Sequence, residues 1–64
     1  PEVPSDVHWL LDLLAEPQEF ATMQTMAEIR GWSRATLARR LALLREAGQI
    51  RLVRRGVYVV SKPS

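Results

Sequence analysis

The chain has 64 residues, of which 47% are hydrophobic, and its formal net charge is +2. This length allows one small domain with no room for a large substrate cavity beside its core, and the absence of cysteine excludes disulfides and thiolate chemistry. No apolar run approaches the about 20 residues that span a bilayer, so we expect a protein of the reducing cytoplasm with no membrane partner.

A helix is the first predicted element, and it runs from about Ser5 to Ala15. Ser5 is a favourable N-cap residue, and Pro17 disfavours helical backbone at the residue before it. The apolar residues between them recur at the spacing of one helical face, and they are Val7, Leu10, Leu11 and Leu14. We expect this face to pack into the core.

The second predicted helix follows an apolar link, Phe20-Ala21, that could form a single bridge of strand. Thr22 is its predicted cap, and the helix runs from Met23 to Arg30. Its inward residues would be Met26, Ala27 and Ile29. Gly31 stands where a residue with positive φ commonly ends a helix.

The third predicted helix is the longest. Ser33 caps it, it runs to about Ala47, and Gly48 ends it. The predicted core stripe lies within about 60° of the helical wheel and consists of Leu37, Leu41 and Leu44. The opposite, exposed face consists of Ala35, Arg39, Ala42 and Glu46.

After Gly48 the hydrophobic pattern changes from the helical period to the alternation of strands. Arg55-Gly56 fits a two-residue hairpin turn, because glycine adopts the positive φ that such turns need. A regular hairpin about this turn would place on one face Ile50, Leu52, Val57 and Val59. The other face would carry Arg51, Val53, Tyr58 and Val60. We expect the first face to pack against the first and third helices.

The order of these elements predicts a mainly α domain of three helices with a small β-hairpin, in which the second and third helices form a helix-turn-helix. The second and third helices are joined by only three residues, 31–33, and must therefore cross steeply. We predict a single domain over residues 5–61. We interpret residues 1–4 and 62–64 as flexible ends and as the boundaries of a piece of a longer protein.

Charge is divided unevenly along the sequence. Residues 1–28 carry six of the seven acids and no lysine or arginine, whereas residues 29–64 carry all nine basic residues. A polyanion would be attracted to the second part and repelled by the first. Arginine, which makes up most of the basic part, also has the planar donor fork that suits phosphate groups and guanine edges.

The exposed side of the third helix has the composition of a surface that enters the DNA major groove. Arg39 lies between the small residues Ala35 and Ala42, so the helix can approach base edges closely while the arginine reaches them. Ser33, Thr36 and the free N–H groups of the first turn suit phosphate oxygens. The other predicted contacts are basic, with Arg34 and Arg40 beside the groove and Arg51, Arg54 and Arg55 on the hairpin, or wing, against the backbone or minor groove.

The run from Ser33 to Ile50 resembles the recognition helix and following turn of winged helix-turn-helix DNA-binding domains. The matching positions are the capping Ser33, Thr36-Leu37, Arg39, Leu41, Leu44, Gly48 and Ile50. The resemblance extends from about Ser5 to Ser61, and it implies a DNA-binding role for Ser33, Arg34, Arg39 and the wing arginines. Residues 54–59 are also similar to the N-terminal winged helices of abortive-infection-type antitoxins, which bind their own promoters.

These features predict a DNA-binding domain of a bacterial transcription regulator, or a DNA-tethering module of a larger protein, located in the cytoplasm with the nucleoid. Double-stranded DNA is the predicted partner. One module of this size makes few base contacts, so we expect a homodimer or a fusion to other domains. The sequence has no phosphate loop, no Ser-His-Asp set and no metal-ligand cluster, so we predict no enzyme activity, cofactor or metal.

Two other functions stay open at this point. One is a protein-interaction winged helix, which would expose an apolar patch around Leu43, Val53 and Val60. The other is RNA binding through the basic hairpin, which would favour structured RNA over a DNA duplex of equal length.

Overall fold

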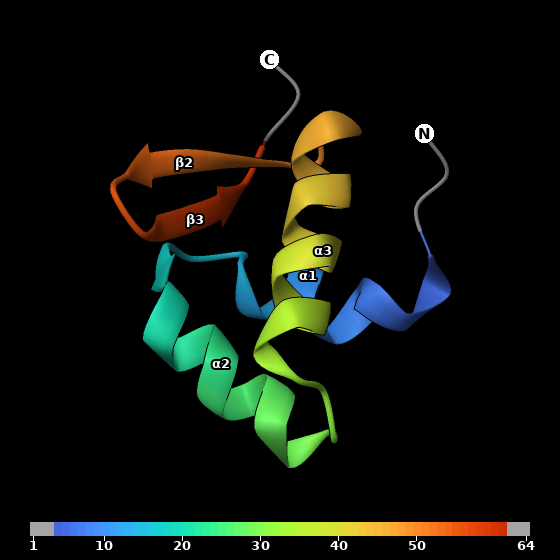
Figure 1. Ribbon diagram of the computed structural model, residues 1–64. Helices are drawn as coiled ribbons and strands as arrows, with labels where there is room; N and C mark the ends of the chain where they lie inside the picture. Colours follow the sequence, from blue (N-terminus) through green and yellow to red (C-terminus); the bar gives the residue numbers. More distant parts are fainter. Residues whose placement is uncertain (1–3, 62–64) are drawn as a thin grey trace.

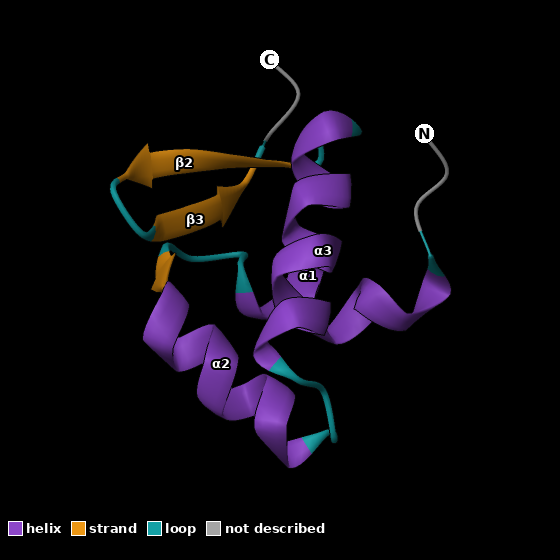
Figure 2. Ribbon diagram, viewed as in Figure 1, coloured by secondary structure: helices purple, strands orange, loops and turns teal. Residues whose placement is uncertain are grey.

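The structure of the protein is a computed structural model that describes residues 4–61. Its elements in chain order are η1 (Ser5–Val7, a 3-10 turn), α1 (His8–Leu13), β1 (Gln18–Glu19), α2 (Phe20–Ile29), α3 (Arg34–Glu46), β2 (Ile50–Arg54) and β3 (Val57–Val60) (Figure 1). Most of the described chain is helical, and the strands lie together at one end (Figure 2). The predicted fold class is confirmed. Of the predicted flexible ends, residues 1–3 and 62–64 lie outside the described residues.

The first helix begins differently from the prediction. Pro4, with extended backbone, stands at the cap position and Ser5 is already inside the 3-10 turn, so Ser5 caps nothing. Proline has a fixed φ near −65°, which suits the residue at a helix entrance and moves the start by one residue. Of the predicted inward face, Val7, Leu10 and Leu14 are buried, with Leu14 past the end of α1. Leu11 is only half-buried and packs against the core cluster.

The second helix begins three residues before its predicted start. Strand β1 is Gln18–Glu19, it pairs antiparallel with β3, and the N–H of Phe20 donates to the carbonyl oxygen of Gly56. This hydrogen bond fixes the point at which the chain leaves the sheet, so α2 starts at Phe20 and Thr22 is not its cap. Ile29, predicted to face inward, is 74% exposed.

The turn between α2 and α3 has the predicted form. Gly31 has a φ of +78°, which favours glycine at this position. The N–H of Trp32 donates to the carbonyl oxygen of Ala27 over 2.9 Å and closes the end of α2. Ser33 is the N-cap of α3, since its side chain accepts a hydrogen bond from the N–H of Thr36.

The hairpin contains a β-bulge that reverses the predicted pairing of its faces. Leu52 lies opposite Tyr58 and Arg54 lies opposite Val57, so Val53 is an extra residue in β2. Residues directly opposite each other lie on the same side of a sheet. Ile50 and Leu52 therefore share a face with the residues opposite them, Tyr58 and Val60, whereas the prediction paired them with Val57 and Val59.

The contacts of the hairpin with the core cluster follow this register, because Ile50 belongs to the cluster and Tyr58 and Val60 pack against it. The other face is covered too: Val57 and Val59 are buried there, as predicted, with Arg54 and Arg51 opposite them. Leu52, predicted to be buried with them, is 39% exposed. In a regular hairpin each residue lies opposite one residue of the other strand. A single inserted residue moves the side chains on one side of the insertion to the opposite face of the sheet.

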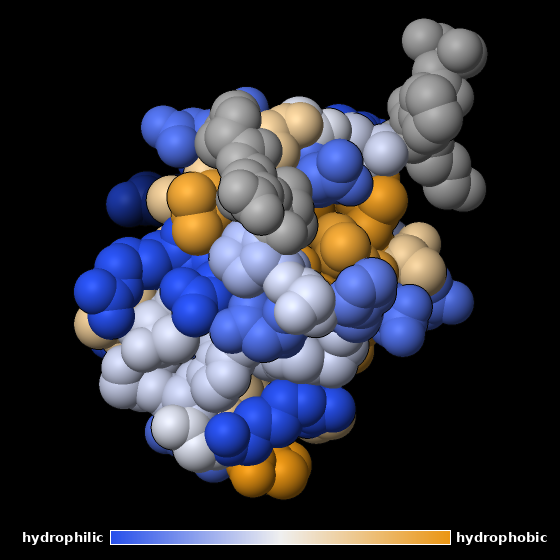
Figure 3. Space-filling model, turned by 90° about the vertical axis from the view of Figure 1, so that its right-hand side faces the viewer, coloured by the Kyte–Doolittle hydropathy of each residue, from blue (hydrophilic) through white to orange (hydrophobic). Residues whose placement is uncertain are grey.

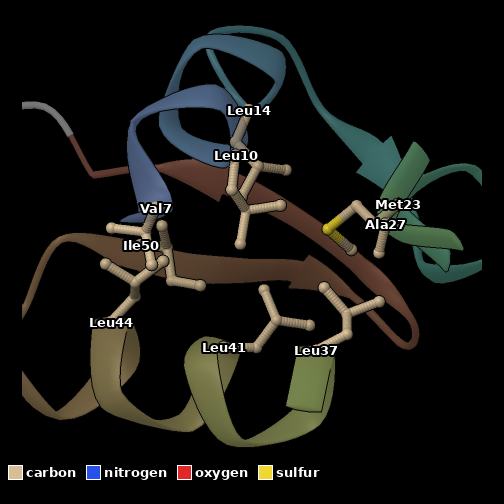
Figure 4. Packing of buried hydrophobic residues seen from close by; sticks show 9 residues of the cluster. All are labelled: Val7, Leu10, Leu14, Met23, Ala27, Leu37, Leu41, Leu44 and Ile50. Carbon is tan, nitrogen blue, oxygen red and sulfur yellow. The ribbon is translucent and has the colours of Figure 1, made fainter. Parts of the chain in front are cut away.

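The core joins all three helices to the hairpin, as Figure 4 shows. Its buried residues are Val7, Leu10, Leu14, Met23, Ala27, Leu37, Leu41, Leu44 and Ile50. The predicted stripe of α3 is thus confirmed, because all three of its leucines are in the cluster. The strand order β1-β3-β2 leaves β2 at the edge of the sheet, where the wing extends away from the helices (Figure 1). None of the helices in residues 4–61 is long and apolar enough to span a membrane.

Candidate nucleic-acid interface

The exposed face of α3 is the central part of the candidate interface. Packing of the leucine stripe against the core leaves the opposite side of the helix in solvent. Ala35, Arg39 and Ala42 are all exposed there, as predicted. Within the described residues Arg39 forms no ion pair, so its guanidinium extends from α3 between two small side chains and is available to an acceptor.

The N-terminus of α3 is ordered by its own side chains. The N–H of Thr36 donates to Ser33 Oγ over 3.1 Å, and the two hydroxyl oxygens lie 3.0 Å apart in a further hydrogen bond. The first intrahelical backbone bond is donated by Leu37 to the Ser33 carbonyl oxygen. The N–H groups of Arg34 and Ala35 precede that bond and have no partner within the helix. They are positioned to receive an anionic oxygen.

Arg34 and Arg40, predicted on the two sides of the groove, are in different environments. Arg34 is exposed, with its Cζ atom 5.6 Å from the centroid of the Phe20 ring. Arg40 is half-buried and binds a carboxylate, because its Nε donates to Asp6 Oδ1 over 3.2 Å and its Nη2 donates to Asp6 Oδ2 over 3.0 Å. Arg34 is therefore open to an external anion, and Arg40 already has an internal one.

The wing provides a second basic surface. Since Arg51 lies opposite Val59 and Arg54 lies opposite Val57, the two arginines share one face of the hairpin, and both are exposed although Val57 and Val59 beside them are buried. They are three positions apart, a spacing that would put them on opposite faces of a regular strand. The bulge at Val53 is what brings them to one side. Arg55 occupies the turn beside Gly56 and is exposed.

Sequence reasoning missed the group of side chains that joins η1 and α1 to the turn before α3. The rings of Trp9 and Trp32 meet edge to face, Arg30 lies over Trp9, and Arg40 lies over Trp32 and binds Asp6. Asp6 and Arg40 are 34 residues apart, so no local pattern connects them. The only sequence signal was the preference of an acid for a first helical turn, and it predicts no partner.

The described residues offer little that would serve catalysis. Among residues 4–61 no group of three His, Cys, Asp or Glu side chains could hold a metal ion. A hollow on α3 is lined by Ala42, Arg45 and Glu46. None of these three side chains is a histidine or carries a hydroxyl group.

Comparison with known protein families gives one match. The family model described as Crp-like helix-turn-helix domain matches residues 7–64, which is most of the chain. The matched range includes α1, both helices of the helix-turn-helix and the whole wing. No curated protein and no solved structure matches the chain. The shorter resemblance to abortive-infection-type antitoxins stays a prediction.

Proposed function

This chain belongs to the Crp-like helix-turn-helix domains, and on that premise we propose that it binds double-stranded DNA with α3 in the major groove and the wing along the backbone or minor groove. The family is one of DNA-binding domains and not of enzymes. The single observation that carries the proposal is the exposed face of α3, where Arg39 stands between Ala35 and Ala42 without an acidic partner among the described residues.

Each part of the surface has a distinct proposed role. Arg39 reads base edges, because a bidentate arginine pairs with the acceptors of guanine. Ser33, Thr36, Arg34 and the N–H groups at Arg34 and Ala35 position the helix on phosphate oxygens. Arg51, Arg54 and Arg55 contact the backbone through the wing and add affinity that does not depend on sequence.

We place this activity in a bacterial transcription regulator that acts at the nucleoid in the cytoplasm. A single module reads few base pairs, so a second copy or a further domain of a longer chain would complete the operator contact. The rival protein-interaction function has less support, because Leu43 and Val60 are half-buried and only Val53 of its predicted patch is exposed. On the face drawn in Figure 3, hydrophilic side chains separate the hydrophobic area at the lower edge from those near the top.

Amide chemical-shift mapping during titration with a random-sequence DNA duplex at low salt tests the proposal. We expect the largest changes at 33–42 and around the wing turn, and small changes on α1. Changes centred on Ile29 or α1, or the absence of binding at low salt, would contradict it. A parallel titration with a structured RNA of equal length separates the RNA-binding alternative, which requires the RNA to bind more tightly.

A further inference from the structure

We propose that Asp6 withholds Arg40 from DNA, so that an arginine on the recognition helix adds nothing to phosphate binding until that carboxylate is removed. This inference rests on the proposed function. It concerns a contact between η1 and the middle of α3 that brings together residues 34 positions apart. Asp6 would thereby act as a positioning residue that limits sequence-independent binding.

The geometry of the contact holds the guanidinium firmly. Nε and Nη2 of Arg40 bind the two carboxylate oxygens of Asp6 in a forked arrangement, at 3.2 and 3.0 Å, which is the strong form of this ion pair. The Arg40 Cζ atom also lies 5.5 Å from the centroid of the Trp32 ring. Three of the five guanidinium N–H groups of Arg40 are not used by Asp6, but the contacts with the carboxylate and with the Trp32 ring fix the direction in which they point.

The electrostatic consequence does not depend on small movements of the side chains. Arg40 and Asp6 form a neutral pair, so at the distance of a phosphate their fields largely cancel. A phosphate that approached Arg40 would also approach the carboxylate, with the like-charge repulsion this entails. Arg34 and Arg39 on the same helix have no such partner among the described residues, and they keep their full charge toward a polyanion.

The Asp6–Arg40 ion pair should contribute little to the stability of the fold. The pair is partly exposed, with side-chain exposures of 26% for Arg40 and 46% for Asp6, and exposed ion pairs add little to stability. Loss of Asp6 should therefore leave the fold in place. Without Asp6, Arg40 would be free to contact one more phosphate, and the slope of log K against log salt concentration would become steeper.

The experiment measures the slope of log K against log salt concentration for a random duplex, with four proteins and one control variant. These are the wild type, Asp6→Asn, Arg40→Gln, and the double variant. Asp12→Asn is the matched control, since Asp12 is an exposed acid of α1 that forms no ion pair within residues 4–61. Glutamine keeps the side chain packed over Trp32, and far-ultraviolet circular dichroism verifies that each variant is folded.

We expect Asp6→Asn to steepen the slope of the wild type by about one unit. Arg40→Gln leaves the Asp6 carboxylate unpaired and should not steepen the slope. The double variant, which loses both charges of the pair, should return to the wild-type slope, and Asp12→Asn should keep it. A slope in the double variant about one unit below that of the wild type would show that Arg40 already contacts phosphate and would overturn the proposal. An unchanged slope in Asp6→Asn would overturn it too. Failure of the wild type to bind any duplex would instead remove the proposed function itself.

Discussion

The indole rings of Trp9 and Trp32 pack edge to face, with their centroids 5.3 Å apart and their planes at 75°. Trp9 belongs to α1 and Trp32 to the turn that joins α2 to α3, so this pair connects the first helix to the helix-turn-helix. Arg30 covers the outer side, with its Cζ atom 4.3 Å from the Trp9 ring centroid, and its Nη1 donates to the carbonyl oxygen of Met26. This aromatic contact, which packs against the core cluster, therefore links α1 to the turn that precedes α3.

Replacement of Trp32 by alanine should lower the free energy of unfolding by about 2–4 kcal/mol, because it removes a large half-buried ring and its edge-to-face partner. At about 4–8 °C per kcal/mol for a domain of this size, the melting temperature followed by circular dichroism should fall by about 8–30 °C. Val53→Ala, which shortens an exposed side chain, is the control and should change the melting temperature little. Equal melting curves for the two variants would mean that the tryptophan pair does not stabilise the domain.

The variant Arg39→Ala should weaken binding to the preferred DNA site by about 1–3 kcal/mol while scarcely changing the affinity for a random duplex. The physical reason is that a base-reading contact forms only where the matching base is present. Fluorescence anisotropy with both duplexes measures the two affinities. Arg45→Ala removes the same charge from the last turn of α3 and should not change their ratio. Equal losses on both duplexes in Arg39→Ala would exclude the base-reading role.

The double variant Arg51→Ala with Arg54→Ala should reduce affinity for all duplexes alike and flatten the salt slope by about two units. These two arginines share one face of the wing, and we expect both to lie on the backbone together. Leu52→Ala changes a neighbouring exposed side chain without loss of charge and should keep the wild-type slope. An unchanged slope in the double variant would show that this face of the wing does not touch DNA.

Leu41→Ala should destabilise the domain by about 2–5 kcal/mol, because Leu41 is 3% exposed in the centre of the core. That loss is comparable with the total stability of a small domain. Chemical denaturation monitored by circular dichroism should show a population that is partly unfolded without denaturant. Ala42→Gly in the exposed face of the same helix changes helix propensity alone, at about 1 kcal/mol. If Leu41→Ala were no less stable than this control, the core stripe would be wrongly assigned.

The sequence was most informative where both ends of an element carry their own signals. For α3 these signals are the Ser33 cap, the leucine spacing and Gly48, each of which acts on backbone or side chains only a few residues away. The start of α2 was predicted wrongly because it depends on a hydrogen bond from Phe20 to Gly56. That contact exists only after the hairpin has folded back onto the link, so local propensity could not indicate it.

The candidate site divides in the same way. The exposed face of α3 follows from helical periodicity, and its arginine and alanines are where the pattern places them. The face of the wing arginines does not follow, because one inserted residue changes the parity of a strand. The partner of Arg40 could not be predicted either, since Asp6 reaches it only through the packing of η1 against α3.

Val53 has no partner of its own in the register of β2 and β3. A deletion of this one residue would therefore leave each cross-strand neighbour where it is and would merely straighten the ribbon. Removal of Arg51 would instead shift Leu52 into the place opposite Val59 and carry it to the other side of the sheet. A related chain could therefore lack one residue in the wing and still keep its arginines on one face, provided that the missing residue is the one at position 53.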